Sequence, residues 1–278
     1  MKEYLNHHFS TDDKDLISII DELPLWSAPF GLSLLNTIKV RKQMKVLDIG
    51  SGLGFPLIEI AQRLGESSIV FGIDPWKEAN ERAKLKINKY SLTNVKVING
   101  TAENLPFENS YFDLIVSNNG INNVEDIPKT LKECRRVGKQ GCQFVFTMNL
   151  EDSMIEFYSV LREELAKRNM PTEIEKMHNH IYQKRKPLEE IKKLLTESGF
   201  KIYAAKENIF YLRFSDGTTM FNHSFIKYWF LPSWKSIVEY KDQEEIFSSV
   251  EVRLNKIAAT ENEIRLSIPF AVFDCVAE

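Results

Sequence analysis

The chain has 278 residues, of which 43% are hydrophobic, so it is long enough to bury a substantial core. A formal net charge of −3 without basic clusters disfavours partners such as nucleic acid or an anionic membrane. The sequence contains neither a signal-peptide pattern nor an apolar run of membrane-spanning length, and its three cysteines are scattered. We therefore expect a soluble, cytoplasmic protein with reduced thiols and no bound metal.

Strand and helix signals alternate through the first half of the chain. Apolar, β-compatible runs predict strands, and stretches with apolar residues at helical spacing lie between them. The expected strands are 45–50, 68–74, 95–100, 112–118 and 142–149, and the expected helices are 55–65, 77–91 and 127–137. This alternation is typical of a parallel sheet with helices on both faces.

The pattern changes after Asn149. We expect helix over 150–183, a helix ended by Gly199 over 186–200, a strand over 201–207, an irregular aromatic-rich stretch over 208–262 and a final extended segment over 264–277.

The predicted organisation is a single domain over 1–278, in which 30–150 form a cofactor-binding core. Residues 151–185 and 208–262 would be insertions that form a substrate cover, and 186–207 and 263–278 would return to the sheet. With residues 1–30, the insertions would cover the carboxyl ends of the strands, where open α/β sheets bind ligands.

The stretch VLDIGSGLGFP, residues 46–56, places three glycines after the first strand. Its spacing fits neither a dinucleotide fingerprint nor a Walker A loop, because Phe55 or Leu57 stands where a third glycine is required and no Gly-Lys pair follows. No Lys or Arg occurs from 46 to 62, which favours a ligand without a pyrophosphate. A glycine-rich turn can also be purely structural, but Asp74 ends the second strand, where a carboxylate can accept ribose hydroxyls.

These stretches, with GTAENLPF (100–107), FDLIVSNNGINNV (112–124) and RRVGKQG (135–141), resemble the motifs of class I S-adenosylmethionine-dependent methyltransferases. The resemblance is to the small-molecule branch related to quinone and sterol methylating enzymes, and it covers roughly residues 25–150. It implies a Rossmann-like fold: a mostly parallel seven-stranded sheet, helices on both faces and an inserted cover. It also implies S-adenosylmethionine as the cofactor and a small-molecule methyl acceptor.

The resemblance assigns roles to residues at the carboxyl ends of the first two strands. Gly50, Ser51 and Gly52 would line the methionine moiety of the cofactor. Asp48 would orient its amino group, and Asp74 would bind the ribose hydroxyls.

A second group would bind the adenine. Pro75 and Trp76 would lie against its face, since an indole offers flat apolar area. The backbone of Ala102 would read its edge. Thr101 stands where the family usually has Asp, so either the Thr101 hydroxyl or Glu103 would accept from the adenine amino group.

Near the fourth strand, Asn118 would lie beneath the sulfonium. Trp26, in the segment 26–31 that resembles the part folding over the cofactor, either closes the site or anchors helix packing. Asn119 either orients a substrate or caps the next helix, and Asn122 and Asn123 are interpreted as caps.

The histidines give no clear general base. His178 and His180 could form a metal pair or a base, but a solvated helix explains them better because no further ligand is spaced for metal binding. His223 could face the substrate, or could be a satisfied core histidine. The surrounding block 221–234 is interpreted as core of the cover first and as a substrate wall second.

The chemistry itself needs few charged groups. A sulfonium methyl is already activated, so transfer requires mainly alignment and exclusion of water. The catalytic residues, the acceptor with its reacting atom, and the oligomeric state do not follow from the sequence. Two alternative functions remain: a non-catalytic S-adenosylmethionine-binding module, and a nicotinamide-dependent oxidoreductase, which the glycine spacing contradicts.

Overall fold

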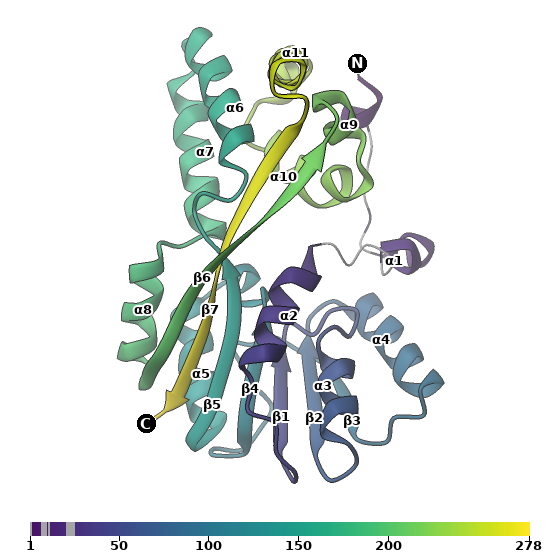
Figure 1. The fold of residues 1–278 in the computed structure, drawn as a ribbon, viewed down its shortest axis with the longest axis vertical. Helices are drawn as coiled ribbons and strands as arrows, with labels where there is room; N and C mark the ends of the chain where they lie inside the picture. Colours follow the sequence, from purple (N-terminus) through teal and green to yellow (C-terminus); the bar gives the residue numbers. More distant parts are fainter. Residues whose placement is uncertain (1, 7–9, 11, 21–25) are drawn as a thin grey trace. The chain divides into compact units, whose positions relative to one another are not determined.

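The structure is a computed structural model that describes residues 2–6, 10, 12–20 and 26–278 (Figure 1). Its backbone contacts divide it into two compact units. The unit that we call the sheet unit comprises Thr11–Asn149, Pro187–Asn208 and Phe270–Glu278, and the helical unit comprises Met1–Ser10, Leu150–Lys186 and Ile209–Pro269. The predicted single-domain organisation, with insertions that cover the site, remains a prediction.

One seven-stranded sheet has the strand order β3-β2-β1-β4-β5-β7-β6. The strands are β1 (Lys45–Ile49), β2 (Ile69–Asp74), β3 (Val95–Asn99), β4 (Phe112–Asn118), β5 (Gly138–Asn149), β6 (Phe200–Phe214) and β7 (Ile264–Ala277). The pairs from β3 to β5 are parallel, whereas β7 runs antiparallel to β5. The predicted mostly parallel, Rossmann-like sheet is confirmed. Because β2 and β4 flank β1, the chain order reverses there, and such switch points are ligand sites.

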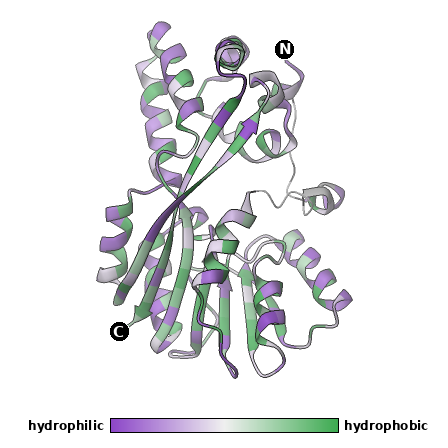
Figure 2. Ribbon diagram, in the orientation of Figure 1, coloured by the Kyte–Doolittle hydropathy of each residue, from purple (hydrophilic) through white to green (hydrophobic). Residues whose placement is uncertain are grey.

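The helices of the sheet unit lie on both sides of the sheet (Figure 1). These helices are α2 (Ser27–Thr37), α3 (Leu57–Leu64), α4 (Lys77–Lys89), α5 (Ile127–Val137) and α8 (Leu188–Glu197). The unit also contains α1 (Lys14–Ile20), which contacts α4, and the 3-10 turn η2 (Ile121–Asn123). Figure 2 shows the central strands coloured mostly hydrophobic, as expected for strands buried on both faces. Gly199, with φ of 84°, follows α8 and ends it as predicted.

The α5 helix illustrates how local sequence sets the bounds of an element. Asp126 precedes it, and its Oδ1 accepts a hydrogen bond of 2.8 Å from the Lys129 N–H. The buried face includes Ile127, Leu131 and Cys134, which recur at helical spacing. Residues 138–141, which precede the expected strand 142–149, already belong to β5, so this strand is longer than predicted.

The helical unit contains the 3-10 turn η1 (Glu3–Asn6), α6 (Ile155–Lys167), α7 (Pro171–Lys184), α9 (Gly217–Asn222), the π-helix η3 (Ile226–Phe230), α10 (Leu231–Lys235) and α11 (Tyr240–Glu261). The prediction that 208–262 is irregular is wrong, because α11 alone has 22 residues. Its buried Phe247, Val250, Leu254 and Ala258 recur at helical spacing, a signal that the aromatic composition obscured.

Aromatic side chains form much of the core of the helical unit. Phe221 and Trp234 have no exposed surface, and the Trp234 ring stacks on Phe157 with 3.7 Å between centroids. The core interpretation of the block 221–234 is confirmed for these two residues. Among the described helices, none has the combination of length and hydropathy needed to cross a membrane.

The three cysteines are free and buried. Burial raises the pKa of both Cys142 and Cys275 to about 12, so these thiols stay protonated at neutral pH. This agrees with the expected reduced, structural thiols.

Candidate functional site

The glycine loop joins β1 to α3 at the carboxyl edge of the sheet. Gly50 has φ of 71°, and a Cβ on it would lie 3.0 Å from the Gly120 Cα, so the loops after β1 and β4 pack backbone against backbone. Gly52 also has positive φ, 46°, but a Cβ there would meet nothing within 4 Å. The loop therefore combines one tightly packed glycine with one that borders open space.

Asp48, on β1 below the loop, is fully buried. Neither of its carboxylate oxygens has a hydrogen-bond partner among the described residues. Burial raises the pKa of Asp48 well above its usual range, and the negative charge of Asp74 raises it further. The nearby Leu57 N–H, which does not reach hydrogen-bonding geometry, offsets only part of this. An unpaired buried carboxylate is costly, so the position suits a cationic ligand group.

Asp74 holds the loop to the end of β2. Its Oδ2 accepts from the Gly52 N–H at 2.9 Å, and its Oδ1 accepts from the Trp76 N–H at 2.8 Å. Burial raises the pKa of Asp74, and these two hydrogen bonds counteract the rise. Each oxygen keeps a lone pair, so the carboxylate can still accept from a ligand hydroxyl.

The residues predicted to bind adenine lie in two segments, one directly before α4 and one after β3. Trp76 is half-buried and directly precedes α4, whereas Pro75 is exposed. After β3, Thr101 is exposed and Ala102 is buried. The Oε1 of Glu103 accepts from the Glu125 N–H at 2.8 Å. Its Oε2 makes no such bond to a described residue, so the choice between Thr101 and Glu103 as the acceptor for an adenine amino group stays a prediction.

Asn118, at the end of β4, connects three elements. Its Nδ2 donates to the Ser27 carbonyl oxygen at 3.1 Å, and its Oδ1 accepts from the Thr147 hydroxyl at 3.1 Å. The first bond fixes the start of α2, directly after Trp26, beside the end of β4. The Trp26 ring lies 5.3 Å from that of Phe30, so it contacts its own helix, and closing the site remains a prediction.

Asn119 has φ of 57°, and its Oδ1 accepts from the Asn149 N–H at 3.2 Å. Asn122 is buried, and its Nδ2 donates to the side chain of Asn149. The cap interpretation is wrong for Asn122 and Asn123, because Asp126 caps α5. Asn119 and Asn122 instead link the loop after β4 to the end of β5, whereas the Nδ2 of Asn123 donates to the Asn119 carbonyl oxygen at 3.3 Å within that loop.

The histidines lie in the helical unit. His223 follows α9, its ring packs edge-on against Phe214 at 5.4 Å, and its buried Nδ1 has no partner among the described residues. His178 is exposed and His180 half-buried on α7. In the described ranges no group of His, Cys, Asp and Glu could hold a metal ion.

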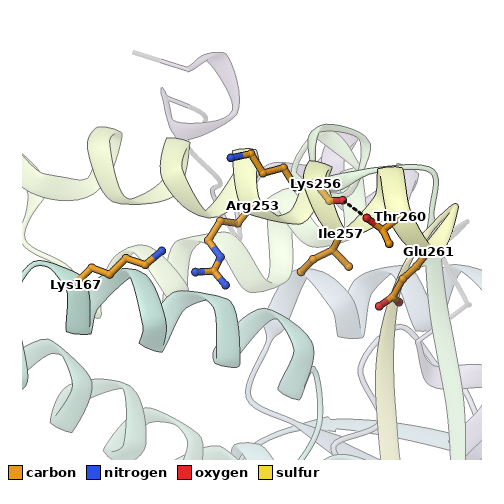
Figure 3. Close-up of a pocket in the computed structure, with 6 residues that line it drawn as sticks. All are labelled: Lys167, Arg253, Lys256, Ile257, Thr260 and Glu261. Carbon is orange, nitrogen blue, oxygen red and sulfur yellow. Dashed lines mark hydrogen bonds between the residues drawn. The ribbon is translucent and has the colours of Figure 1, made fainter.

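A surface groove of about 470 Å³ lies between α6 and α11, also in the helical unit (Figure 3). Lys167 lines it from α6, and Arg253 and Lys256 from α11. Lys167 pairs with Glu164 at 2.7 Å, and Arg253 pairs with the same carboxylate at 3.4 Å. None of the predicted cofactor residues lines the groove, and its paired charges describe a solvated helix interface.

Sequence analysis missed two residues of this site. Gly120 lies in the quoted stretch after β4, and a Cβ on it would come 2.7 Å from the Ile49 carbonyl oxygen. Asn80 faces back from α4 and donates to the Asp74 carbonyl oxygen at 2.8 Å, with its Oδ1 buried and unpartnered within the described structure. Asn80 lies six residues after Asp74 in the sequence, and this spacing is the signal that could have identified it.

The residues of the sheet unit fit S-adenosylmethionine. The orphaned Asp48 carboxylate suits an ammonium group, the space beside Gly52 admits a close-lying chain, and Asp74 retains capacity for hydroxyls. Ser51 fits only through its backbone, because its side chain packs against Gly72 of β2.

The chain is similar to proteins described as methyltransferases. Residues 40–171 match the family model described as a methyltransferase domain. A demethylmenaquinone methyltransferase of Geobacillus sp. (strain WCH70) is 33% identical over 123 residues, which cover 44% of this chain and 53% of the relative. Its namesake from Staphylococcus aureus (strain MRSA252) is 38% identical over 108 residues, which cover 39% and 44%. The chain thus spans about half the length of these curated relatives.

Among solved structures, a SAM-dependent methyltransferase from Aquifex aeolicus matches with a TM-score of 0.54 at 17% identity. The match covers 95% of this chain and 99% of that chain. At this identity the likeness concerns the fold, which is the Rossmann-like methyltransferase fold.

Proposed function

The chain carries a class I methyltransferase domain that resembles the quinone methyltransferases, and we propose that it transfers a methyl group from S-adenosylmethionine to a small-molecule acceptor. The observation that carries the proposal is the buried, unpaired Asp48 carboxylate beneath a glycine loop with open space beside Gly52. A pyrophosphate would place further negative charge near Asp48 and Asp74, with no cation in the loop to offset it.

Bound S-adenosylmethionine supplies an electrophilic methyl group on a sulfonium. The residues of this chain hold and orient: Asp48 pairs with the ammonium, Asp74 accepts from the ribose hydroxyls, and Trp76 covers the adenine. Asn118 and Thr147 fix the start of α2 over this edge. Alignment and water exclusion of this kind can account for much of the rate of an in-line displacement.

The acceptor does not carry over from the relatives. The matched segments end before most of the helical unit, which contains the insertions predicted to choose the acceptor. We therefore propose a small, partly apolar acceptor. The quinone in the names of the relatives is not assigned to this chain.

Calorimetric titration with S-adenosylmethionine, S-adenosylhomocysteine, NAD and NADP tests the cofactor assignment. We expect binding of the two sulfur ligands and none of the nicotinamide ligands. Binding of NAD or NADP alone would overturn the proposal. A methyl-transfer assay with labelled cofactor against a panel of small acceptors then separates an enzyme from a binding module.

A further inference from the structure

Arg185 directly follows α7 in the helical unit and is only 3% exposed. Its Nη1 donates to the Tyr158 hydroxyl at 3.2 Å. Its Nε is buried and has no hydrogen-bond partner among the described residues. A guanidinium carries its charge at every physiological pH, so a buried positive charge with an unused donor requires an explanation.

The polar side chains that these contacts place around Arg185, those of Tyr158, Trp234 and His180, carry no negative charge. Trp234 Nε1 donates to the same Tyr158 hydroxyl at 3.1 Å, so that oxygen already accepts twice. The His180 ring lies 6.2 Å from the Tyr158 ring, and burial, together with the charges of Arg185 and Lys184, lowers the pKa of His180 to about 4. His180 is therefore uncharged at neutral pH. Within the described ranges no carboxylate lies within ion-pair distance of Arg185.

Two contacts stabilise the positive charge of Arg185, but neither supplies the negative charge that would pair with it. The guanidinium carbon lies 5.2 Å from the centroid of the Tyr158 ring, within range of a cation–π interaction. The carboxyl end of α7 also carries partial negative charge. Neither contact satisfies the Nε–H, which lost its hydrogen bond to water on burial, and buried charges are normally both paired and hydrogen-bonded.

Among the described residues, the hydrogen bond from Nη1 to Tyr158 leaves the edge of the guanidinium formed by Nε and Nη2 unused. This edge presents two parallel N–H donors, the arrangement that binds a planar carboxylate in a bidentate manner. We propose that Arg185 forms a binding site for the carboxylate group of a small molecule. The site is defined within the helical unit alone, so it does not depend on methyl transfer.

Titration of the full-length protein with sodium benzoate tests the proposal, with inorganic phosphate as a second arm, at constant ionic strength. The readouts are calorimetry and the midpoint of thermal unfolding. We expect saturable benzoate binding to the wild type and binding at least about tenfold weaker to Arg185→Gln. Lys256→Gln is the matched control, since it removes an exposed charge from the groove in the same unit, and it should bind like the wild type.

Arg185→Lys keeps the charge but loses the two-donor edge, so benzoate should bind about tenfold more weakly than to the wild type. This variant decides the matter if circular dichroism shows that Arg185→Gln does not fold. Absence of saturable benzoate binding to the wild type would overturn the proposal, as would equal binding by wild type and Arg185→Lys. Binding of phosphate but not benzoate would overturn the carboxylate assignment.

Discussion

Asp48 and Asp74 are carboxylates at the same edge of the sheet, but their surroundings give them different roles. Asp74 accepts two backbone N–H groups, whereas both oxygens of Asp48 lack a partner among the described residues. Burial raises the pKa of both, and Asp48 is also affected by the charge of Asp74. Of these two carboxylates, Asp48 is therefore the one whose ionisation costs the ligand-free protein more.

Replacing Asp48 by Asn should stabilise the ligand-free protein at pH 7 to 8. A raised folded-state pKa means that the folded protein binds the proton more tightly than the unfolded chain does, so wild-type stability falls as pH rises above the unfolded value of about 4. The advantage of Asp48→Asn should disappear below that pH. Urea unfolding of both proteins across this range measures the difference.

The same substitution should weaken S-adenosylhomocysteine binding by on the order of tenfold, because a neutral amide cannot make a charge-assisted bond to an ammonium. Calorimetry at pH 7.5 measures it. A variant that is more stable yet binds as tightly as the wild type would show that Asp48 does not contact the ligand.

Asp74, Trp76 and Thr101 should differ in their contributions to cofactor affinity. Asp74→Ala should lose on the order of 3 kcal/mol, about a hundredfold, because it removes charge-assisted bonds to the ribose and also releases the Gly52 N–H. Trp76→Ala should lose roughly 1–2 kcal/mol of stacking, and Thr101→Ala about 1 kcal/mol.

Titration of the three variants with S-adenosylmethionine tests the order. Asp74→Asn serves as the control, because it keeps an acceptor oxygen for the loop while it removes the charge, and it should fall between Asp74→Ala and the wild type. If Asp74→Ala binds as well as Thr101→Ala, the ribose is bound elsewhere.

At the scale of elements, the glycine loop is held by contacts with its neighbours on both sides. Gly50 packs against the loop after β4, and Gly52 is fixed by Asp74 of β2. Positive φ at both positions requires glycine or a strained residue. The space beside Gly52 is the part of the loop that a ligand can use.

Gly52→Ala and Gly141→Ala form a matched pair. Both glycines have positive φ, 46° and 77°, and a Cβ on either would meet nothing within 4 Å. Both variants should therefore lose a similar free energy of unfolding, about 1–2 kcal/mol of backbone strain. Only Gly52→Ala should weaken S-adenosylhomocysteine binding, which calorimetry and urea unfolding together would show. Equal affinities would place the ligand away from Gly52.

The structure of the whole molecule bears on how the acceptor is chosen. The two compact units have boundaries near those predicted for the cofactor core and the insertions. The matched family segment, residues 40–171, covers most of the sheet unit. In the helical unit it covers only residues 150–171. That the helical unit selects the acceptor remains a prediction.

Hydrogen exchange with and without S-adenosylhomocysteine should show added protection in 26–31 and in at least one of the segments 150–183 and 208–262. The physical reason is that a cover that closes on the ligand exchanges its amides more slowly. The part of residues 1–30 at 1, 7–9, 11 and 21–25 lies outside the described residues. If the changes are confined to the glycine loop and Asp74, the predicted cover is a separate structural module.

The sequence by itself determined the order of strands and helices from 45 to 149 and the placing of Asp48, the glycines and Asp74 at strand ends. These features depend on periodicity, propensity and turn chemistry within a few residues of one another, which a linear reading can recognise. The prediction from sequence failed at α11, where apolar residues recur at helical spacing but the aromatic composition of the surrounding stretch argued against a helix.

Only the tertiary structure decided which distant groups meet. The contact of Gly50 with Gly120, the bond from Asn118 to Ser27 and the bond from the Glu125 N–H to Glu103 each join segments that are separated in sequence. The missing partners of Asp48 and Arg185 are likewise visible only in three dimensions. A buried group's hydrogen bonds and pKa depend on everything packed around it, and that surrounding shell is assembled by topology rather than by neighbouring residues.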